Sequence, residues 1–396
     1  MGLQRLREAQ RETDKFPSVL NLPWAVTVFD NAEMVKGMSE RQYNNCIADY
    51  YGELLMTYRI HGYDRGRSEV AIAHLDPETP SKILKTYVIS GLPCPRGTEH
   101  LEDARLFTHD GRLWVTYTEV RDYNDRPWRC SQRLVRLKSV DGKWVGEKEV
   151  RIKYGKNDQG QEKNWQFFSL GGKLYFIYGI KSHKVCELDV ETGAVVQEYE
   201  TPGIKNWPYG SLSGGTPPLL VGDRFVSFFH SYVPHAYRCR RYSMSAYEFE
   251  AKPPFKILRV SQKPLAYGSA KDGYADDPRF NGWQPLVTFP SGLVFHGDNY
   301  LVSVGINDHL STLFSMPCGL VSAGMGPTVF SERVGPRKFK TKNFNNPVRV
   351  HGQGMNKPRF YSWTRIGDST DGVMVATDPH LINALENLPF VDEITL

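Results

Sequence analysis

The stretch Asp110-Gly111-Arg112-Leu113-Trp114-Val115-Thr116-Tyr117-Thr118 joins a tight polar turn to a run of residues that favour β-strands. Its glycine permits the positive φ that a tight hairpin needs, and apolar and aromatic side chains dominate the run that follows. The same turn-and-strand pattern occurs four more times, at 51–59, 171–178, 221–230 and 296–304. The sequence therefore predicts a five-unit β array.

The turn glycines lie roughly 50 to 75 residues apart, which is about the length of one four-stranded sheet with its loops. A flat open sheet with this many strands would leave long unpaired edges, whereas radial closure leaves only short ones. We therefore expect an all-β fold, a five-bladed β-propeller. A large β-sandwich with similar hairpins is the alternative.

Three segments are expected along the chain. Residues 1–20 form an N-terminal appendage with a short N-terminal helix, because residues 1–14 have helical composition. Residues 21–330 form the five-bladed propeller as the catalytic domain. Residues 331–396 form an irregular C-terminal extension, a closing or interface segment in which 372–377 is typical of a strand and 378–385 of a short helix.

Composition limits the function classes. The 396 residues carry a net charge of only +5, and the six cysteines are spread singly, which favours reduced thiols and predicts no metal. No stretch approaches 18 uninterrupted apolar residues, and the N-terminus lacks the apolar core of a signal peptide, so we expect a soluble, cytoplasmic protein. The sequence contains no P-loop of nucleotide-binding proteins, no dinucleotide-binding glycine motif, no serine-hydrolase elbow and no zinc-protease motif. No cofactor is predicted.

One C-terminal stretch, 333–349, is rich in basic residues interleaved with phenylalanines. It would suit a surface that contacts nucleic acid, although a solvated basic loop has the same composition. An oligomer is also possible through the C-terminal segment. The basic residues are Arg333, Arg337, Lys338, Lys340, Lys342 and Arg349.

Polar residues surround the predicted inner strands, where apolar residues would be less costly to bury. Because a propeller places the first strand of each blade beside the central axis, these residues should converge on one funnel. The stretches are Tyr43-Asn44-Asn45 with Arg59, Glu102-Asp103-Ala104-Arg105, Glu162-Lys163-Asn164-Trp165, Gly214-Gly215-Thr216-Pro217-Pro218 with Phe229-His230, and Phe289-Pro290-Ser291-Gly292 with Gly305-Ile306-Asn307-Asp308.

This ordered series resembles the blade motifs of glycoside hydrolase family 130, a family of five-bladed propellers that are mostly β-mannoside phosphorylases with some hydrolases. The resemblance covers about residues 40 to 320. It implies that Asp103 is the catalytic acid, since the aspartate of a Glu-Asp-Pro-Arg-like motif has this role in the family. Ala104 stands where the family usually has proline, and Asn164 departs from a more usual Lys-Asp-like run, so the chain resembles a divergent member.

The mechanism that the resemblance implies is inverting. Asp103 assists departure of the leaving group, in the family through a sugar hydroxyl, while phosphate attacks the anomeric carbon from the opposite face. Inversion by water needs a second carboxylate about 6.5 to 9.5 Å away as a base, whereas phosphate is already an anion. One acid is then sufficient.

A phosphorylase must also hold an oxyanion, for which arginine, lysine and histidine donors are suited. Arg59, Lys163 and His230 are the phosphate-binding candidates, and Asn45, Arg105 and Asp308 are the sugar-binding candidates. Two alternatives stay open: Arg59 and Arg105 could form internal ion pairs with Glu102 or Asp103, and His230 could be a satisfied core histidine. Trp165, Trp207 and Trp283 could stack on sugars or pack in the core.

The sequence thus favours an inverting carbohydrate-active enzyme, a phosphorylase with phosphate or sugar-phosphate in a central funnel. A glycosyltransferase that uses a sugar-phosphate or nucleotide-sugar donor on a glycan or nucleic-acid acceptor is the alternative. A non-catalytic sugar-binding propeller is the third hypothesis.

Overall fold

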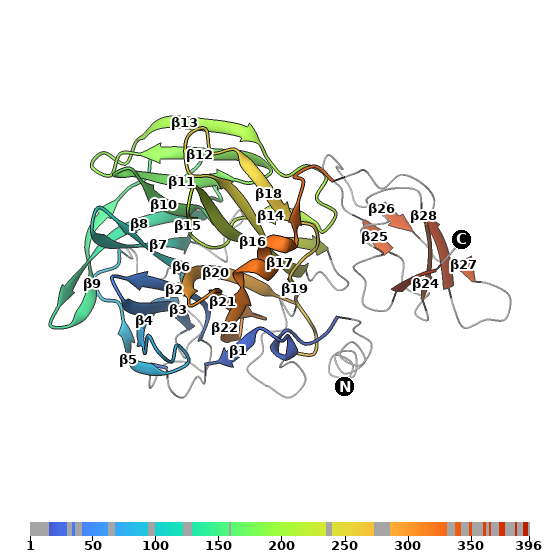
Figure 1. Cartoon of the computed structure of the whole chain (residues 1–396), viewed down its shortest axis with the longest axis horizontal. Helices are drawn as coiled ribbons and strands as arrows, with labels where there is room; N and C mark the ends of the chain where they lie inside the picture. Colours follow the sequence, from blue (N-terminus) through green and yellow to red (C-terminus); the bar gives the residue numbers. More distant parts are fainter. Residues whose placement is uncertain are drawn as a thin grey trace.

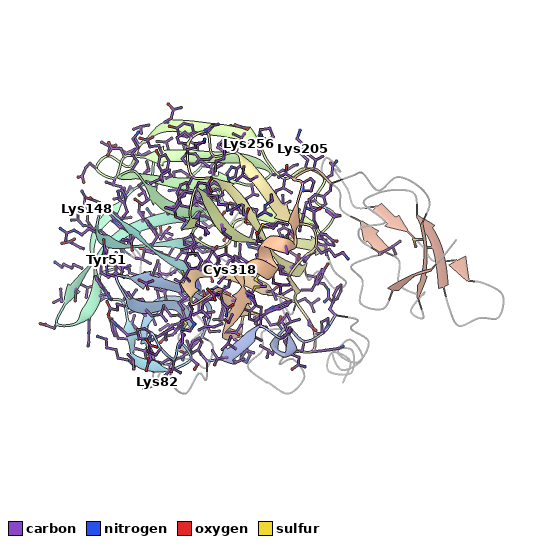
Figure 2. All side chains as sticks on the ribbon, in the orientation of Figure 1. Tyr51, Lys82, Lys148, Lys205, Lys256 and Cys318 are labelled. Atoms are coloured by element: carbon purple, nitrogen blue, oxygen red, sulfur yellow. The ribbon has the colours of Figure 1, made fainter. Side chains whose placement is uncertain are left out.

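The strands of the computed structural model surround a central axis (Figure 1). The structure describes residues 16–29, 34–35, 42–61, 68–93, 100–121, 129–157, 160–234, 240–272 and 286–330, and in the C-terminal segment 337–341, 348–350, 359–361, 364–365, 372–376, 385 and 391–394. The predicted N-terminal helix lies outside these residues. None of the helices in the described part of the chain has the length and apolar character needed to cross a bilayer.

Strand pairing places the strands between residues 25 and 326 in four sheets, and the largest of these joins two antiparallel groups through a single parallel bridge between Ser68 and His100. We call the resulting five antiparallel groups blades one to five. The first three are continuous in sequence. Blade one contains β2 (Gln42–Tyr50), β3 (Glu53–His61), β4 (Ser68–Leu75) and β5 (Ile83–Val88); blade two contains β6 (His100–His109), β7 (Arg112–Arg121), β8 (Arg129–Val140) and β9 (Lys143–Val150); blade three contains β10 (Gln166–Leu170), β11 (Lys173–Gly179), β12 (Ser182–Leu188) and β13 (Val195–Pro202).

The last two blades are less regular. Blade four contains β14 (Ser211–Ser213), β15 (Leu219–Val221), β16 (Arg224–Pro234), β17 (Arg240–Glu250) and β18 (Ile257–Ser261), with the short β19 (Ala266–Tyr267) and β23 (Met325–Gly326) paired to it; blade five contains β20 (Thr288–His296), β21 (Asn299–Ile306), β22 (Leu310–Pro317) and β1 (Ala25–Val28). Strand β1 thus comes from the N-terminal side of the chain and completes the last blade.

The predicted turns join the inner two strands of the blades. Tyr51 and Gly52 both have positive φ, and so do Asp110 and Gly111, which is the backbone geometry that suits a two-residue hairpin between twisted strands. Figure 1 shows β2, β6 and β20 near the centre and β5, β9 and β13 at the periphery. The prediction of an all-β propeller is confirmed.

The core consists of five apolar clusters, each between two neighbouring blades. Representative pairs are Leu55 with Val115 between blades one and two, Trp114 with Phe167 between two and three, Phe168 with Phe225 between three and four, Phe228 with Val302 between four and five, and Leu301 with Met56 between five and one. Burial of apolar surface is the main stabilising contribution to folding. The cluster between blades five and one therefore holds the two ends of the ring together.

Two segments flank the blades. The 3-10 turn η1 (Val19–Asn21) buries Val19 against blades four and five, and the helix α2 (Cys318–Ala323) follows β22. In the C-terminal segment, β24 (Arg337–Thr341), β27 (Thr364–Arg365), β28 (Gly372–Ala376) and β29 (Val391–Ile394) form a separate four-stranded sheet, while β25 (Val348–Val350) pairs with β26 (Arg359–Tyr361). Strand β28 confirms the predicted strand at 372–377. The domain limits and the closing or interface role of 331–396 stay predictions.

Candidate active site

Each of the first three blades holds one polar residue in the left-handed backbone conformation near the start of its inner strand. These residues are Asn44, Asp103 and Asn164, with φ of 53°, 53° and 63°. In β2 and β6 the strand pairing shifts register at this point, which marks a β-bulge. Asparagine and aspartate tolerate this conformation better than other side chains with a Cβ. A repeated backbone conformation therefore presents a short polar side chain at the inner end of each of these three blades.

Asp103 is nearly buried and is held by the neighbouring blade. Its Oδ1 accepts a hydrogen bond from Asn44 Nδ2 at 2.7 Å, and the residue is 5% exposed. Its Oδ2 has no hydrogen-bond partner among the described residues. The bond from Asn44 thus fixes the position of one carboxylate oxygen.

Arg105 connects three blades from a fully buried position. Its Nε donates to Gly215 O at 2.6 Å, its Nη1 to Asp103 O at 3.0 Å and its Nη2 to Asn164 Oδ1 at 3.3 Å. Its guanidinium also lies 5.4 Å from the ring centre of Phe289. All three donors of Arg105 thus bind protein carbonyl or amide oxygens. Arg105 therefore links the inner ends of blades two, three and four.

Arg59 forms the internal ion pair that the sequence left open. Its Nη2 lies 2.7 Å from Glu102 Oε1, and both side chains are buried. The guanidinium also lies 5.3 Å from the ring centre of Tyr43. Because a paired guanidinium still carries its charge, Arg59 remains a source of positive potential beside Asp103.

Opposite charges hold Asp103 and Lys163 in their ionised forms. Burial acts to raise the pKa of Asp103, but Lys163, Arg59, Arg105 and the bond from Asn44 outweigh it, and the pKa lies below the ordinary aspartate value. Desolvation acts to lower the pKa of Lys163, but the charges of Asp103 and Glu102 raise it above the ordinary value. The Lys163 side chain is accessible to solvent. An anion that enters the funnel can reach it.

The same charges act on Asp308, but its pKa is raised. Burial, Asp103 and Glu102 raise the pKa of Asp308 to about 7, although Arg59 and Lys163 oppose the shift. It lies in the turn between β21 and β22, where Asn307 and Asp308 both have positive φ. The funnel therefore holds two carboxyl groups whose pKa values are displaced in opposite directions, as acid and base groups in active sites are.

His230 lies in the funnel wall as a neutral imidazole. Burial lowers its pKa to about 3, and the charges of Arg105 and Lys163 add to this effect. Its ring stacks on Tyr242 and lies 4.8 Å from that of Phe289, while its Nδ1 has no hydrogen-bond partner in the described part of the chain. It can offer a hydrogen bond to an anion but not a positive charge at neutral pH.

Asn45 is the one sugar-binding candidate that the structure separates from the others. It is fully buried, and its Nδ2 donates to Thr312 O at 3.0 Å while its main-chain carbonyl accepts from Ser291. Because adjacent residues of a strand point to opposite sides, Asn45 joins blade five while Asn44 reaches Asp103.

The aromatic and thiol side chains behave as core residues. Trp165 stacks on Phe176 and Trp207 donates to Ser231, both at buried positions, so core packing is confirmed for them; Trp283 lies outside the described residues. The buried free cysteines are Cys46, Cys130 and Cys186. Within the described residues, no group of histidine, cysteine, aspartate and glutamate is arranged to hold a metal. Within the basic stretch 333–349, the structure describes only the backbone of residues 337–341 and 348–349.

Two functional contacts were not assigned from the sequence. Asn44 positions Asp103, and Asn307 anchors the turn that carries Asp308. A signal for Asn44 was present, because Asn44, Asp103 and Asn164 stand at the same distance ahead of their turns. No comparable signal exists for Asn307, since its partners Val287, Ser269 and Asp272 come from distant segments.

No family model matches the sequence, and no curated protein matches it. Solved structures do. The β-1,2-mannobiose phosphorylase from Listeria innocua, in complex with β-1,2-mannobiose, has 15% identity and a TM-score of 0.54 over 78% of this chain and 98% of its own. A mannose phosphorylase from Leishmania mexicana, in complex with a phosphate ion, has 13% identity and a TM-score of 0.50 over 83% and 97%.

A third structure belongs to glycoside hydrolase family 130, described as a family of mannoside phosphorylases that contains hydrolases acting on β-1,2-mannosidic linkages in Candida mannan. It has 14% identity and a TM-score of 0.52 over 77% of this chain and 94% of its own. The fold is that of these propellers. The resemblance predicted from the blade motifs is confirmed at the level of the fold.

Proposed function

We propose that this chain is a carbohydrate-active enzyme that transfers a glycosyl unit with inversion, in the manner of the β-mannoside phosphorylases. The observation that carries the proposal is the position of Asp103 among cations: Arg105 donates to its main-chain oxygen, Arg59 pairs with the adjacent Glu102, and the charges of Lys163 and Arg59 lower the pKa of its carboxyl. Asp103 is the acid. Lys163 and Arg59 attract the anion, and His230 offers a neutral donor.

The lowered pKa of Asp103 has a mechanistic consequence. A general acid must carry a proton, yet the cations keep Asp103 ionised as long as no anion offsets their charges. An anion bound beside Lys163 and Arg59 offsets their charges and raises the pKa of Asp103. The acid form is therefore favoured only when the anion is bound, which links the two requirements of phosphorolysis.

Atoms balance in the proposed step. The bond between the anomeric carbon and the leaving-group oxygen breaks, and an oxygen of phosphate forms the new bond on the opposite face. Asp103 supplies the proton of the leaving group, directly or through a sugar hydroxyl as in the resembling family. The products are a sugar 1-phosphate and the shortened glycan, and Asp103 regains its proton from solvent.

The choice of phosphate rather than water follows from charge. Water attack needs a base, whereas a phosphate anion needs cationic and hydrogen-bond donors. Lys163 is accessible to solvent and lies at the funnel, which suits the second requirement. Asp308 is then left to contact sugar hydroxyls, and Arg105 braces the site.

The test is turnover with a defined donor. The purified chain is incubated with mannose 1-phosphate or with nucleotide sugars, each with a panel of sugar acceptors, and release of phosphate or nucleotide is followed. We expect phosphate release with a sugar 1-phosphate. Nucleotide release would instead establish the glycosyltransferase, with a glycan or nucleic-acid acceptor, and sugar binding without turnover would establish the non-catalytic propeller. Cytoplasmic location, nucleic-acid contact through 333–349 and oligomerisation stay predictions.

A further inference from the structure

Asn44 lies between Asp103 and blade five. Its Nδ2 donates to Asp103 Oδ1 at 2.7 Å, while its Oδ1 is buried and has no hydrogen-bond partner in the described part of the chain. Because a carboxylate accepts but does not donate, only this orientation of the amide gives Asp103 a hydrogen bond. The bond to Asp103 thus holds one end of the amide, and packing holds the other.

The Oδ1 end of the amide packs against Gly305 on β21. A Cβ at residue 305 would overlap Asn44 Oδ1 and would lie 3.0 Å from the Cα and the N of Asn44. Gly305 does not have a positive φ, so its backbone would accept a residue with a side chain. The space that Asn44 occupies, and not the backbone, is therefore what requires glycine at this position.

Strand β2 cannot move away from residue 305 without losing bonds to blade five. These bonds involve the β2 main chain on both sides of Asn44 and three serine hydroxyls of blade five. They join Ser311 Oγ to Gln42 O at 3.1 Å, Ser291 Oγ to Asn45 O at 2.6 Å and Ile47 N to Ser303 Oγ at 3.0 Å. All of these residues are buried, and a buried polar group that loses its partner is costly. A side chain at 305 would therefore displace the Asn44 amide rather than the strand.

We propose that Gly305 is a positioning residue for Asp103, because the absence of a side chain at 305 lets the Asn44 amide reach the carboxylate. The contact passes from blade five through Asn44 of blade one to Asp103 of blade two. The inference rests on the proposed function, since it takes Asp103 as the acid. It extends the site to a residue that has no side chain of its own to offer a substrate.

Displacement of the Asn44 amide has two consequences for catalysis. Asp103 loses the bond that fixes its Oδ1, and a small misplacement of a reacting group lowers a rate by about tenfold to a hundredfold. Burial acts to raise the pKa of Asp103, and the bond from Asn44 is one of the contacts that lower it. Without this bond the pKa rises, so the acid keeps its proton to higher pH. A general loss of stability would not produce the second effect.

The experiment measures phosphorolysis against pH in the full chain for the parent, Gly305→Ala, Asn44→Gly and the double variant. Glycine at 44 keeps the left-handed backbone and removes the amide. We expect each single variant to lower the acid-side plateau of kcat/KM about tenfold or more and to move its alkaline limb to higher pH. The KM for phosphate should stay within about twofold of the parent value, because Arg59 and Lys163 are unchanged.

The double variant decides whether Gly305 acts through Asn44. In the Asn44→Gly background a Cβ at 305 has no amide to displace, so the added Gly305→Ala should change the plateau by no more than about twofold. If Gly305→Ala alone does not fold, the double variant should restore folding, because the overlap with Oδ1 is gone. Equal fold-losses in both backgrounds, or a double variant that also fails to fold, overturn the inference.

Gly146→Ala is the matched control. Gly146 lies in β9 without a positive φ, and a Cβ there would overlap the main chain of Gly91, which follows β5. This variant should lower the melting temperature and leave the plateau and the alkaline limb of kcat/KM in place. A folded Gly305→Ala with the kinetics of the parent, or an equal limb shift in Gly146→Ala, overturns the inference and leaves Asp103 as the acid. Absence of turnover in the parent with every donor overturns the proposed function, and the inference with it.

Discussion

The inner strands of blades two and three differ in one decisive side chain at the same backbone position. Asp103 and Asn164 both adopt the left-handed conformation, and both take part in bonds between neighbouring blades. Asn164 uses its amide to donate to Ser213 and to accept from Arg105. The comparison teaches that the left-handed residue is a structural device of the propeller, whereas the proposed acid function requires a carboxylate placed among cations.

The strongest way to break the comparison is to make blade two resemble blade three. Asp103→Asn should lower kcat/KM at least about a hundredfold, because the variant has no acid to protonate the leaving group. Its melting temperature should stay close to that of the parent, since asparagine already adopts this conformation at 44 and 164 and can still accept the bond from Asn44. The measurements are steady-state phosphorolysis and thermal unfolding. Equal rates in a folded variant would remove Asp103 from the acid role.

The fold could be predicted from the sequence because its signals are local. A turn glycine and the strand residues after it lie within one hairpin, so each of the five units appears in a window of about ten residues. The contribution of β1 to blade five has no such signal, because Ala25 pairs with Phe314 across most of the chain. Strand propensity depends on residues that are close in sequence. It does not predict which distant sheet edge a strand will pair with.

The site could be predicted only in part, for the same reason. Convergence of the inner strands brings Asp103, Arg59 and Lys163 together, and the turn spacing is sufficient to predict it. The opposite pKa shifts of Asp103 and Asp308 depend on burial and on charges from several blades, which no single motif contains. Asn45 shows how a local motif can mislead. It is adjacent to Asn44, but its side chain bonds to Thr312 O and not to Asp103.

Lys163, the cation directly before Asn164, sharpens the comparison. Lys163→Gln should raise KM for phosphate about tenfold or more, because a charge-assisted hydrogen bond is worth about 1.5 to 3 kcal/mol. Its kcat should change less, since loss of this charge also raises the pKa of Asp103 and favours the acid form. The control is Lys173→Gln, which removes an exposed lysine paired with Glu187 at the outer end of the same inner hairpin. An unchanged KM would place the anion elsewhere.

The smallest expected effect comes from the reverse exchange, Asn164→Asp, which gives blade three the side chain of blade two. Aspartate suits the left-handed backbone, and the new carboxylate would lie beside Arg105, which now donates to Asn164 Oδ1. A like charge near Asp103 raises its pKa, by about half a unit to one unit for a partly compensated neighbour. The alkaline limb of kcat/KM against pH, where the acid loses its proton, should therefore move to higher pH by that amount.

A matched control keeps the Asn164→Asp result specific to the funnel. Asn206 also has positive φ, but it is exposed and donates to Phe330 O away from the charged residues. Asn206→Asp should leave the pH profile unchanged, because solvent screens its charge from Asp103. If Asn164→Asp folds and its alkaline limb does not move, then the group that titrates in that limb does not sense a charge at position 164. The limb would then have to be assigned to a group other than Asp103.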